Sequence, residues 1–408
     1  MSRTPALQRI LIYSIDYAPD MVGIAKYTAE LAQWHRQRGA LVTVVTAYPY
    51  YPAWRVAPGY RAWAYRRERV AGVDLWRCPL WVPRRPRGWS RILHLLSFAC
   101  SSLPLVLWCA VRHRPDLVLV NEPPLLCAPG ALAAAWLGRG MAWLHVQDFE
   151  VDAAFGLGLL RPGRLGRLLY GVERRLMRRF DRVSTISARM AQRLADKGVD
   201  RDRIRYLPNW IDARFIRPQA PDRDYARHLG IEPGRKVFLY SGNLGRKQGV
   251  EILAETARRC AHRRDLVFLV CGEGVTRDAL LDEARSLPNL LVRPLQPATH
   301  LDRLLGLAYA HLLPQRRDAE DLVLPSKLSA MCASARPVLT TANPGSQLHA
   351  WVGQFGIAVP AGDPAALADA VVYLADHPRA ARAHGRAARE FALRHWEMQR
   401  VLSRVWPA

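Results

Sequence analysis

Lysine is scarce in this sequence. Among its 408 residues 59 are basic, of which only five are lysine and 54 are arginine, so the net charge of +24 partly reflects a general preference for arginine. Arginine clusters at residues 61–70, 84–91 and 173–182 indicate surfaces that attract nucleic acid, anionic lipid or phosphorylated ligands, or else solvated basic faces.

Cysteine motifs and a secretion signal are also missing. The seven cysteines have no C-x-x-C spacing and lie mostly in apolar runs, which argues against a zinc site or a disulfide framework and suits a reducing compartment. The amino terminus lacks a long apolar core followed by a small-residue cleavage site. Residues 9–15 are therefore expected to form a buried strand rather than part of a signal peptide.

Apolar runs alternate with helical patterns twice along the chain, which predicts an α/β fold with two parallel sheets. The length also fits two domains of about 200 residues each. The first half has expected strands at 9–15, 41–47, 116–120, 141–146 and 182–186, with a helix at 23–39. The second half has expected strands at 236–242, 265–272, 290–295, 310–315, 336–341 and 355–360.

Residues 208–224 carry charges and prolines without periodicity, so we expect the interdomain linker there. The predicted domains cover residues 1–213 and 214–392. A helix within residues 393–408 is expected to pack back on the first domain.

The segment 92–111 is apolar over about 20 residues and is flanked by arginines, which is the pattern of a membrane-spanning helix. Pro104, the serines and the position between strands of one domain argue against a span. Two interpretations stay open, a core helix with one side facing the membrane and a fully buried helix. The tryptophans and arginines nearby support docking at a membrane surface.

The segment SGNLGRKQGVEIL (241–253) follows an expected strand and opens a helix. Gly242 and Gly245 let a ligand approach the backbone, and the helix N-terminus with Arg246 and Lys247 suits a diphosphate. An ordinary strand–helix turn is the alternative. Because lysine is so rare in the chain, its presence here favours a binding role.

Two later segments occupy the positions where parallel sheets bind ligands. CGEG (271–274) follows the next expected strand, but it lacks the third glycine of a dinucleotide fingerprint. Ser326 and Lys327 stand at an expected helix start. Ser326 is a plausible N-cap, and the Lys327 ammonium would neutralise a departing nucleotide diphosphate unless it is simply a solvated surface lysine.

Seven segments of the chain form an ordered set. They are DYAPDMVGIAKYTAELA (16–32), AYPYYPAW (47–54), HVQDFEVDAAFGLG (145–158), LPNWID (207–212), SGNLGRKQG (241–249), CGEG (271–274), and LPSKLSAM followed by RPV (324–338). Together they resemble family 4 retaining glycosyltransferases of the GT-B fold, in particular the colanic-acid-type exopolysaccharide enzymes of bacteria. This resemblance covers almost the whole chain.

The resemblance implies two Rossmann-like domains that face each other across a cleft, the first for the acceptor and the second for a nucleotide-sugar donor. The implied catalytic set is Arg246, Lys247, Lys327 and Asp148. The implied donor contacts are Gly23, Gly242, Asn243, Gly272, Glu273, Gly274, Arg293, Gln296, Ser326 and Asp321. The implied acceptor or hinge residues are His145, Gln147, Glu150 and Asn209, with a core histidine as the alternative for His145.

The chain departs from the family pattern at three places. Two glutamates eight positions apart are common in the family, and Leu322 and Ala330 stand at those positions here. The histidine that often precedes the aspartate of the first domain is Gln147. The contacts that these family residues would make to the sugar or ribose are therefore expected to differ in this chain.

The implied reaction moves a sugar, with retention, from a GDP- or UDP-sugar to a polyprenyl-diphosphate-linked glycan at the inner face of the cytoplasmic membrane. It depends on orientation and phosphate stabilisation, so neither a cofactor nor a metal is expected. Two D-x-D strings, at residues 200–202 and 222–224, are interpreted as solvated charge.

Two other function classes were weighed. Another GT-B sugar-nucleotide enzyme, such as an epimerase, would handle the same donor but need acid–base carboxylates. A basic nucleic-acid-binding protein would need a recognition helix or an RNA-binding signature, and none is seen. No nucleic-acid partner is therefore expected.

Overall fold

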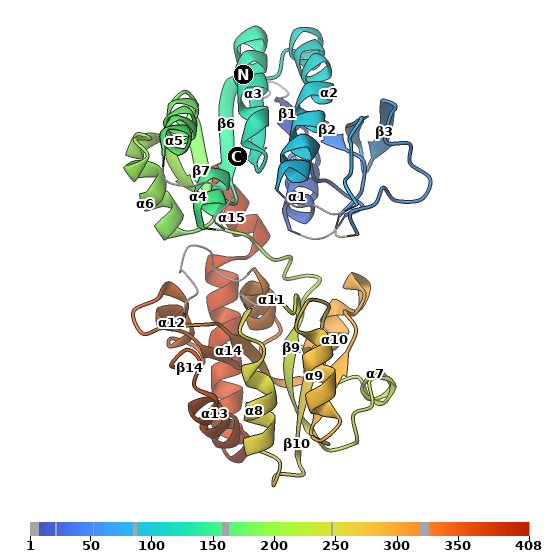
Figure 1. Cartoon of the computed structure of the whole chain (residues 1–408), viewed down its shortest axis with the longest axis vertical. Coiled ribbons are helices and arrows are strands. Elements are labelled where there is room, and N and C mark those ends of the chain that lie inside the picture. Colours follow the sequence, from blue (N-terminus) through green and yellow to red (C-terminus); the bar gives the residue numbers. More distant parts are fainter. Residues whose placement is uncertain are drawn as a thin grey trace, which may run out of the picture. The chain divides into compact units, whose positions relative to one another are not determined.

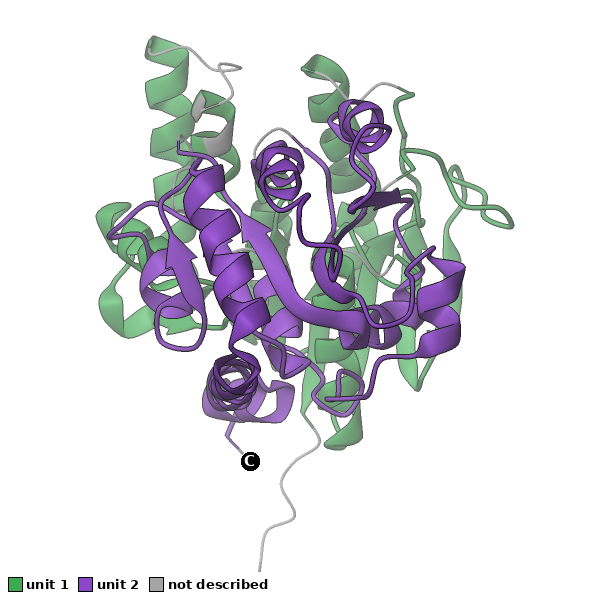
Figure 2. Ribbon diagram, turned by 90° about the horizontal axis from the view of Figure 1, so that it is seen from below, with its two compact units in different colours: residues 1–208 green, residues 209–408 purple. Residues whose placement is uncertain are grey.

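A computed structural model describes residues 8–20, 23–51, 53–84, 88–156, 163–245, 248–317 and 326–407. The chain divides into two compact units, Met1–Pro208 and Asn209–Ala408 (Figures 1 and 2). Each unit has a largely parallel sheet with helices packed on it, so the predicted α/β class is confirmed. The docking of residues 393–408 on the first domain stays a prediction.

Unit 1 contains a sheet of eight strands in the order β3-β4-β2-β1-β5-β6-β7-β8. Its strands are β1 (Arg9–Tyr13), β2 (Leu41–Ala47), β3 (Arg66–Val70), β4 (Val73–Cys78), β5 (Leu117–Glu122), β6 (Met141–Val146), β7 (Arg182–Thr185) and β8 (Ile204–Tyr206). Its α-helices are α1 (Ile24–Gln37), α2 (Trp89–His113), α3 (Ala128–Gly138), α4 (Glu150–Gly156), α5 (Arg164–Met177) and α6 (Ala188–Asp196).

The hairpin of β3 and β4 was not predicted. β3 is antiparallel to β4 at the edge of the sheet, and it coincides with the second half of the 61–70 arginine cluster. Its arginines pair with carboxylates of the same hairpin, for example Arg66 with Glu68 at 3.0 Å and Arg67 with Asp74 at 3.5 Å. Charged side chains on an edge strand discourage pairing with another chain, which gives part of this cluster a structural role.

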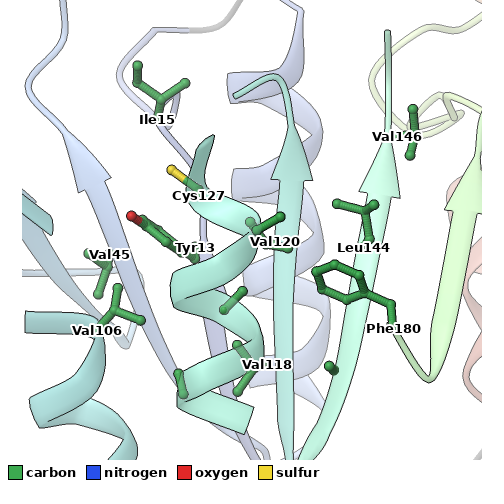
Figure 3. Close-up of a cluster of buried hydrophobic side chains, with 14 of the residues drawn as sticks. Tyr13, Ile15, Val45, Val106, Val118, Val120, Cys127, Leu144, Val146 and Phe180 are labelled. Carbon is green, nitrogen blue, oxygen red and sulfur yellow. The ribbon is translucent and has the colours of Figure 1, made fainter. Parts of the chain in front are cut away.

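The core of unit 1 lies where α2 and α3 cover one face of the sheet. Figure 3 shows Val106 of α2 and Cys127, which directly precedes α3, beside the strand residues Tyr13, Val45 and Val120. All five are buried. The apolar strands therefore form the buried sheet that their composition predicts.

Helix α2 is the apolar segment expected at 92–111, and among the described residues it is the helix long and apolar enough to cross a membrane by length and composition. Its inner side is built into unit 1. The Ser102 hydroxyl lies 2.5 Å from the Tyr13 hydroxyl, and His94 Nδ1 lies 2.7 Å from the carbonyl oxygen of Trp81. Its outer side exposes large apolar residues, so α2 is neither a separate span nor fully buried. These exposed residues are Trp89, Ile92, Leu93, Leu96, Leu103, Trp108 and Val111.

Unit 2 contains a parallel sheet of six strands in the order β11-β10-β9-β12-β13-β14. Its strands are β9 (Lys236–Ser241), β10 (Leu266–Cys271), β11 (Leu290–Arg293), β12 (Ala308–Pro314), β13 (Val338–Thr341) and β14 (Ile357–Val359). Its α-helices are α7 (Arg223–His228), α8 (Ile252–Arg259), α9 (Arg277–Ala284), α10 (Leu301–Leu307), α11 (Lys327–Ala333), α12 (Gln347–Val352), α13 (Pro364–Asp376), α14 (Pro378–His395) and α15 (Met398–Val405).

Each sheet has one point where the chain reverses its direction of strand addition. In unit 1, β2, β4 and β3 extend the sheet on one side of β1, and β5 then pairs with the other side of β1. In unit 2, β10 and β11 extend the sheet on one side of β9, and β12 then pairs with the other side of β9. Ligands of open parallel sheets bind outside the carboxyl ends of the strands at such switch points. The loops after β1, β5, β9 and β12 are therefore where a site is expected.

Candidate donor site in the second unit

Lys327 lies at the switch point of unit 2, at the start of α11. Its ammonium donates a hydrogen bond of 2.8 Å to the Tyr240 hydroxyl, at the end of β9, and lies 4.1 Å from the centre of the Tyr240 ring. The Tyr240 hydroxyl in turn donates to the carbonyl of Asn243 at 2.6 Å. The phenol thus holds the ammonium in place without neutralising its charge.

The charge of Lys327 has no carboxylate partner among the residues that the structure describes. Burial lowers the pKa of Lys327 to about 8, because the charged form loses hydration. A partly buried ammonium without a counter-charge attracts an anion, which restores the lost stabilisation.

Gly242 provides the room that Lys327 occupies. Its φ is +142°, and a Cβ atom there would lie 2.8 Å from the Lys327 nitrogen. Any other residue would be strained at this φ and would displace the ammonium. The glycine predicted for ligand approach therefore serves first to admit the lysine.

The turn at residues 272–274 packs directly on the loop after β9. The Leu244 amide donates to the Glu273 carbonyl at 2.8 Å, and the Gly242 amide donates to the Cys271 carbonyl at 2.9 Å. A Cβ atom at Gly272 would lie 2.0 Å from the Gly242 carbonyl oxygen. These glycines allow two backbone loops to lie against each other at the carboxyl ends of neighbouring strands.

Ser326 occupies the N-cap position of α11, as predicted, but its backbone is helical and its side chain makes no capping hydrogen bond. Its carbonyl accepts from the Ser329 hydroxyl at 3.1 Å instead. Three other predicted site residues, Arg246, Lys247 and Asp321, lie outside the described residues, so their roles stay predictions.

Arg293 is the last residue of β11, and Gln296 lies in the loop that follows it. The Arg293 guanidinium donates to the carbonyls of Leu229 at 2.8 Å and Val292 at 3.1 Å. The Gln296 amide oxygen accepts from the Tyr225 hydroxyl at 3.0 Å. Both side chains thus have partners inside unit 2, and their contact with a nucleotide base stays a prediction.

The residues predicted for the acceptor belong to unit 1, and His145 is the most enclosed of them. It is 5% exposed, its Nδ1 lies 2.9 Å from the Ser184 hydroxyl, and the Gln147 amide donates to its Nε2 at 2.9 Å. Burial lowers its pKa to about 4, so the ring is neutral at pH 7. The structure places His145 in the core, the alternative weighed above.

Glu150 begins α4, and its carboxylate accepts a hydrogen bond from the Leu125 amide. Burial raises the pKa of Glu150, and the neighbouring Asp148 and Glu173 raise it further. Asp148 itself is exposed at the carboxyl end of β6. Of these residues Asp148 is therefore the most exposed.

Gly23 and Asn209 occupy two further predicted positions. Gly23 precedes α1 with a φ of +60°, and a Cβ atom there would meet nothing within 4 Å. The first turn of α1 contains no acidic residue, so its free amides remain suited to an anion. Asn209 is partly buried at the first position of unit 2.

Sequence reasoning missed Tyr240. It lies in an apolar strand and is fully buried, so the pattern gives no sign that its hydroxyl meets Lys327. The contact between Lys327 and Tyr240 depends on the strand order, because β9 and β12 become neighbours only once the sheet is assembled.

Comparison with known proteins agrees with this geometry. Residues 22–210 match the model of the glycosyl transferase 4-like domain, and residues 235–377 match that of the glycosyl transferases group 1. A relative from Escherichia coli K12 named "Putative colanic acid biosynthesis glycosyl transferase WcaI" is 39% identical over 402 residues, which cover 97% of this chain and 98% of that protein.

Two solved structures share the fold. Sucrose-phosphate synthase from Thermosynechococcus elongatus has a TM-score of 0.71 at 16% identity and covers 98% of this chain and 97% of its own. The Anabaena protein Alr3699/HepE, solved in complex with UDP-glucose, has a TM-score of 0.68 at 12% identity, with coverage of 97% and 98%.

The two family models and the Escherichia coli relative thus span both units, and the epimerase alternative is not favoured. The chain belongs to the glycosyltransferases whose first domain is of the glycosyl transferase 4-like type and whose second is of glycosyl transferases group 1, and it is a glycosyltransferase of the GT-B fold.

Proposed function

We propose that unit 2 binds a nucleoside-diphosphate sugar, GDP- or UDP-linked, with the diphosphate on Lys327. The observation that carries this proposal is the ammonium of Lys327, partly buried at the switch point and held by Tyr240 and Gly242. The UDP-glucose complex of the structurally similar Anabaena protein supports a donor of this class.

In the proposed reaction the positive charge of Lys327 stabilises the diphosphate as the bond to the sugar breaks. Such stabilisation is largest where water is excluded, which the partial burial of the lysine provides. Retention of configuration and independence of metal ions are part of the proposal, as are Arg246 and Lys247 as further phosphate contacts.

The donor assignment is tested by thermal unfolding with a panel of nucleoside diphosphates. A ligand that binds only the folded protein raises the melting temperature, so UDP or GDP should do so. Lys327→Ala and Lys247→Ala should each weaken this shift and nearly abolish sugar transfer while leaving the fold intact. Unchanged transfer in both variants would remove the donor-site assignment.

We further propose that the acceptor is a polyprenyl-diphosphate-linked glycan of exopolysaccharide biosynthesis, reached from the cytoplasmic side of the membrane. The name of the Escherichia coli relative supports this pathway. The exposed apolar side of α2 supports a membrane location, since large apolar side chains are rarely left in water without a partner.

Unit 1 would dock on an anionic bilayer through α2 and α5. On α2 the exposed apolar side lies between Arg91 and Arg112. On α5 the apolar residues Leu165, Leu168 and Val172 are exposed at helical spacing among arginines. Apolar residues enter the lipid and arginines pair with anionic headgroups.

Sedimentation with vesicles of anionic lipid at low salt tests this docking. Binding that weakens with added salt is expected. A protein that stays in the supernatant under these conditions would contradict the membrane proposal but leave the donor site untouched.

A further inference from the structure

An aromatic cluster lies at the carboxyl ends of β1 and β2 in unit 1, and none of the roles above uses it. It consists of Tyr50, Tyr51, Trp54 and His94. The Trp54 ring lies 5.6 Å from Tyr50, 6.5 Å from Tyr51 and 5.2 Å from His94, measured between ring centres. Tyr50 and His94 are buried, Trp54 is partly buried, and Tyr51 is 40% exposed. The cluster thus has buried rings on its inner side and the partly exposed rings of Trp54 and Tyr51 on its outer side.

The loop that carries this cluster is held in an uncommon conformation. Trp54 has a φ of +50°, in the left-handed region that bulky residues rarely adopt. The Asp20 carboxylate accepts hydrogen bonds from the amides of Tyr50 at 3.1 Å and Tyr51 at 3.2 Å. Strained backbone that is held in this way is concentrated at functional sites.

Two buried hydrogen-bond acceptors at the cluster, the Oδ1 atom of Asp16 and the Nε2 atom of His94, have no donor within hydrogen-bond distance among the residues that the structure describes. The Asp16 carboxyl also interacts with the Tyr50 hydroxyl of the cluster. His94 Nδ1 faces the Trp81 carbonyl, so Nδ1 carries the proton and Nε2 of the neutral ring can only accept. Buried acceptors of this kind require a donor from a ligand or from ordered water.

A cation lies beside the same cluster. Arg91, in the first turn of α2, is exposed. Its positive charge acts to lower the pKa values of Tyr50, His94 and Glu150, so it lies near all three side chains. Arginine binds phosphate oxygens through paired hydrogen bonds. Exposed apolar residues of α2, Ile92 and Leu93, follow it directly.

We propose that this cluster binds the headgroup of the acceptor, a sugar joined through a diphosphate to a polyprenyl chain. The sugar ring packs on Tyr51 and Trp54, its hydroxyls donate to the carboxylate of Asp16, and its diphosphate pairs with Arg91. Aromatic surface with a few directed polar groups is the usual composition of a small-molecule site. The inference rests on the proposed lipid-linked acceptor and assigns its headgroup to residues other than His145 and Glu150.

The experiment measures binding without any nucleotide sugar. Isothermal titration uses short-chain citronellyl diphosphate joined to glucose, galactose or N-acetylglucosamine, with sugar-free citronellyl diphosphate and the free sugars as separate arms. At least one sugar-bearing lipid should bind the wild-type protein more tightly than either partial ligand. Trp54→Ala and Tyr51→Ala should weaken that complex at least about fivefold and spare the sugar-free lipid, whereas Arg91→Gln should weaken both.

Matched controls are Trp63→Ala and Arg201→Gln, which change exposed residues of the same unit outside the cluster and outside α2. Every variant is also checked for thermal unfolding and for nucleotide binding by unit 2. Unchanged lipid binding in the folded cluster variants, or no binding of any sugar-bearing lipid by the wild-type protein, would overturn the inference. A wild-type protein that neither binds a nucleotide nor transfers a sugar would instead overturn the proposed function.

Discussion

The two units have related sheets but carry different chemistry at their switch points. Unit 2 places one cation, Lys327, between β9 and β12 and packs glycine loops around it. Unit 1 places carboxylates and aromatic rings after β1 and β2. The same strand arrangement thus carries a partly buried cation in one unit and carboxylates with aromatic rings in the other, because the chemistry depends on loop residues and not on the sheet.

Their surfaces differ as well. Among the described residues, 21 exposed large apolar side chains lie in unit 1 and four in unit 2. Most of those on α2 follow the helix along one side, opposite the buried side that starts at His94. This difference supports the proposal that unit 1 contacts the lipid-bearing substrate and unit 2 contacts the nucleotide.

The largest effect should come from removing the cation of unit 2. Lys327→Met should lower the transfer rate about 100-fold or more, as loss of one group that stabilises a developing anion does in other enzymes. Binding of a prenyl diphosphate sugar by unit 1 should not change. Steady-state transfer and calorimetry measure the two properties separately, and equal losses in both would break the division between the units.

Gly242→Ala should have the next largest effect. The added Cβ would lie 2.8 Å from the Lys327 nitrogen and displace it, so nucleotide affinity should fall about tenfold. Gly234→Ala is the matched control, because Gly234 also has a positive φ, of +82°, but open space around it. Both variants should lose similar stability, measured by denaturant unfolding, and only Gly242→Ala should lose nucleotide affinity.

A third change tests the surface of unit 1. Leu93→Asp combined with Leu96→Asp should reduce binding to anionic vesicles about tenfold, because two charges would have to leave water. Leu41→Asp, on an exposed residue at the start of β2, serves as the control. Vesicle sedimentation gives the result, and equal losses in both proteins would mean that α2 is not the docking face.

The affinity of unit 2 for nucleotides should depend on pH. Lys327 has a pKa of about 8 in the folded protein, below its ordinary 10.5, so the free protein loses this charge as pH rises above 8. Affinity for UDP or GDP should therefore fall by up to about tenfold per pH unit above pH 8. Lys327→Arg should abolish the decline, since arginine stays charged.

The lowered pKa of Lys327 makes the free energy of unfolding change with pH in the opposite direction to nucleotide affinity. Because the unfolded chain binds more protons than the folded protein between pH 8 and 10.5, the contribution of Lys327 to the free energy of unfolding increases as pH rises through that range. Replacing Lys327 by an uncharged residue should therefore not unfold the protein.

Tyr240→Phe should have the smallest effect. The ring remains under the ammonium, but the hydroxyl that accepts its hydrogen bond is lost. The charged form of Lys327 would then be less stable, so nucleotide affinity should fall about two- to fivefold and its decline with pH should begin below pH 8. A uniform loss at all pH values would indicate a purely structural role for Tyr240.

The apolar strands could be predicted from the sequence because their composition determines them. β2 and β6 have the limits expected at 41–47 and 141–146. The hairpin of β3 and β4 could not, since its arginines and acidic residues hide the alternation of an edge strand. Lys327 was predicted from its position at an expected helix start and from the family resemblance, whereas its contact with Tyr240 follows from strand order, which long-range packing sets.

Proton uptake on nucleotide binding tests the claim that Lys327 of unit 2 holds the donor diphosphate. Isothermal titration of UDP and GDP at pH 8 in two buffers of different ionisation enthalpy measures it. Because Lys327 is half protonated at this pH, the nucleotide that binds should cause uptake of about half a proton in the wild-type protein. Lys327→Met should show weaker binding without uptake. Equal affinity and equal proton uptake in the two proteins would contradict the claim.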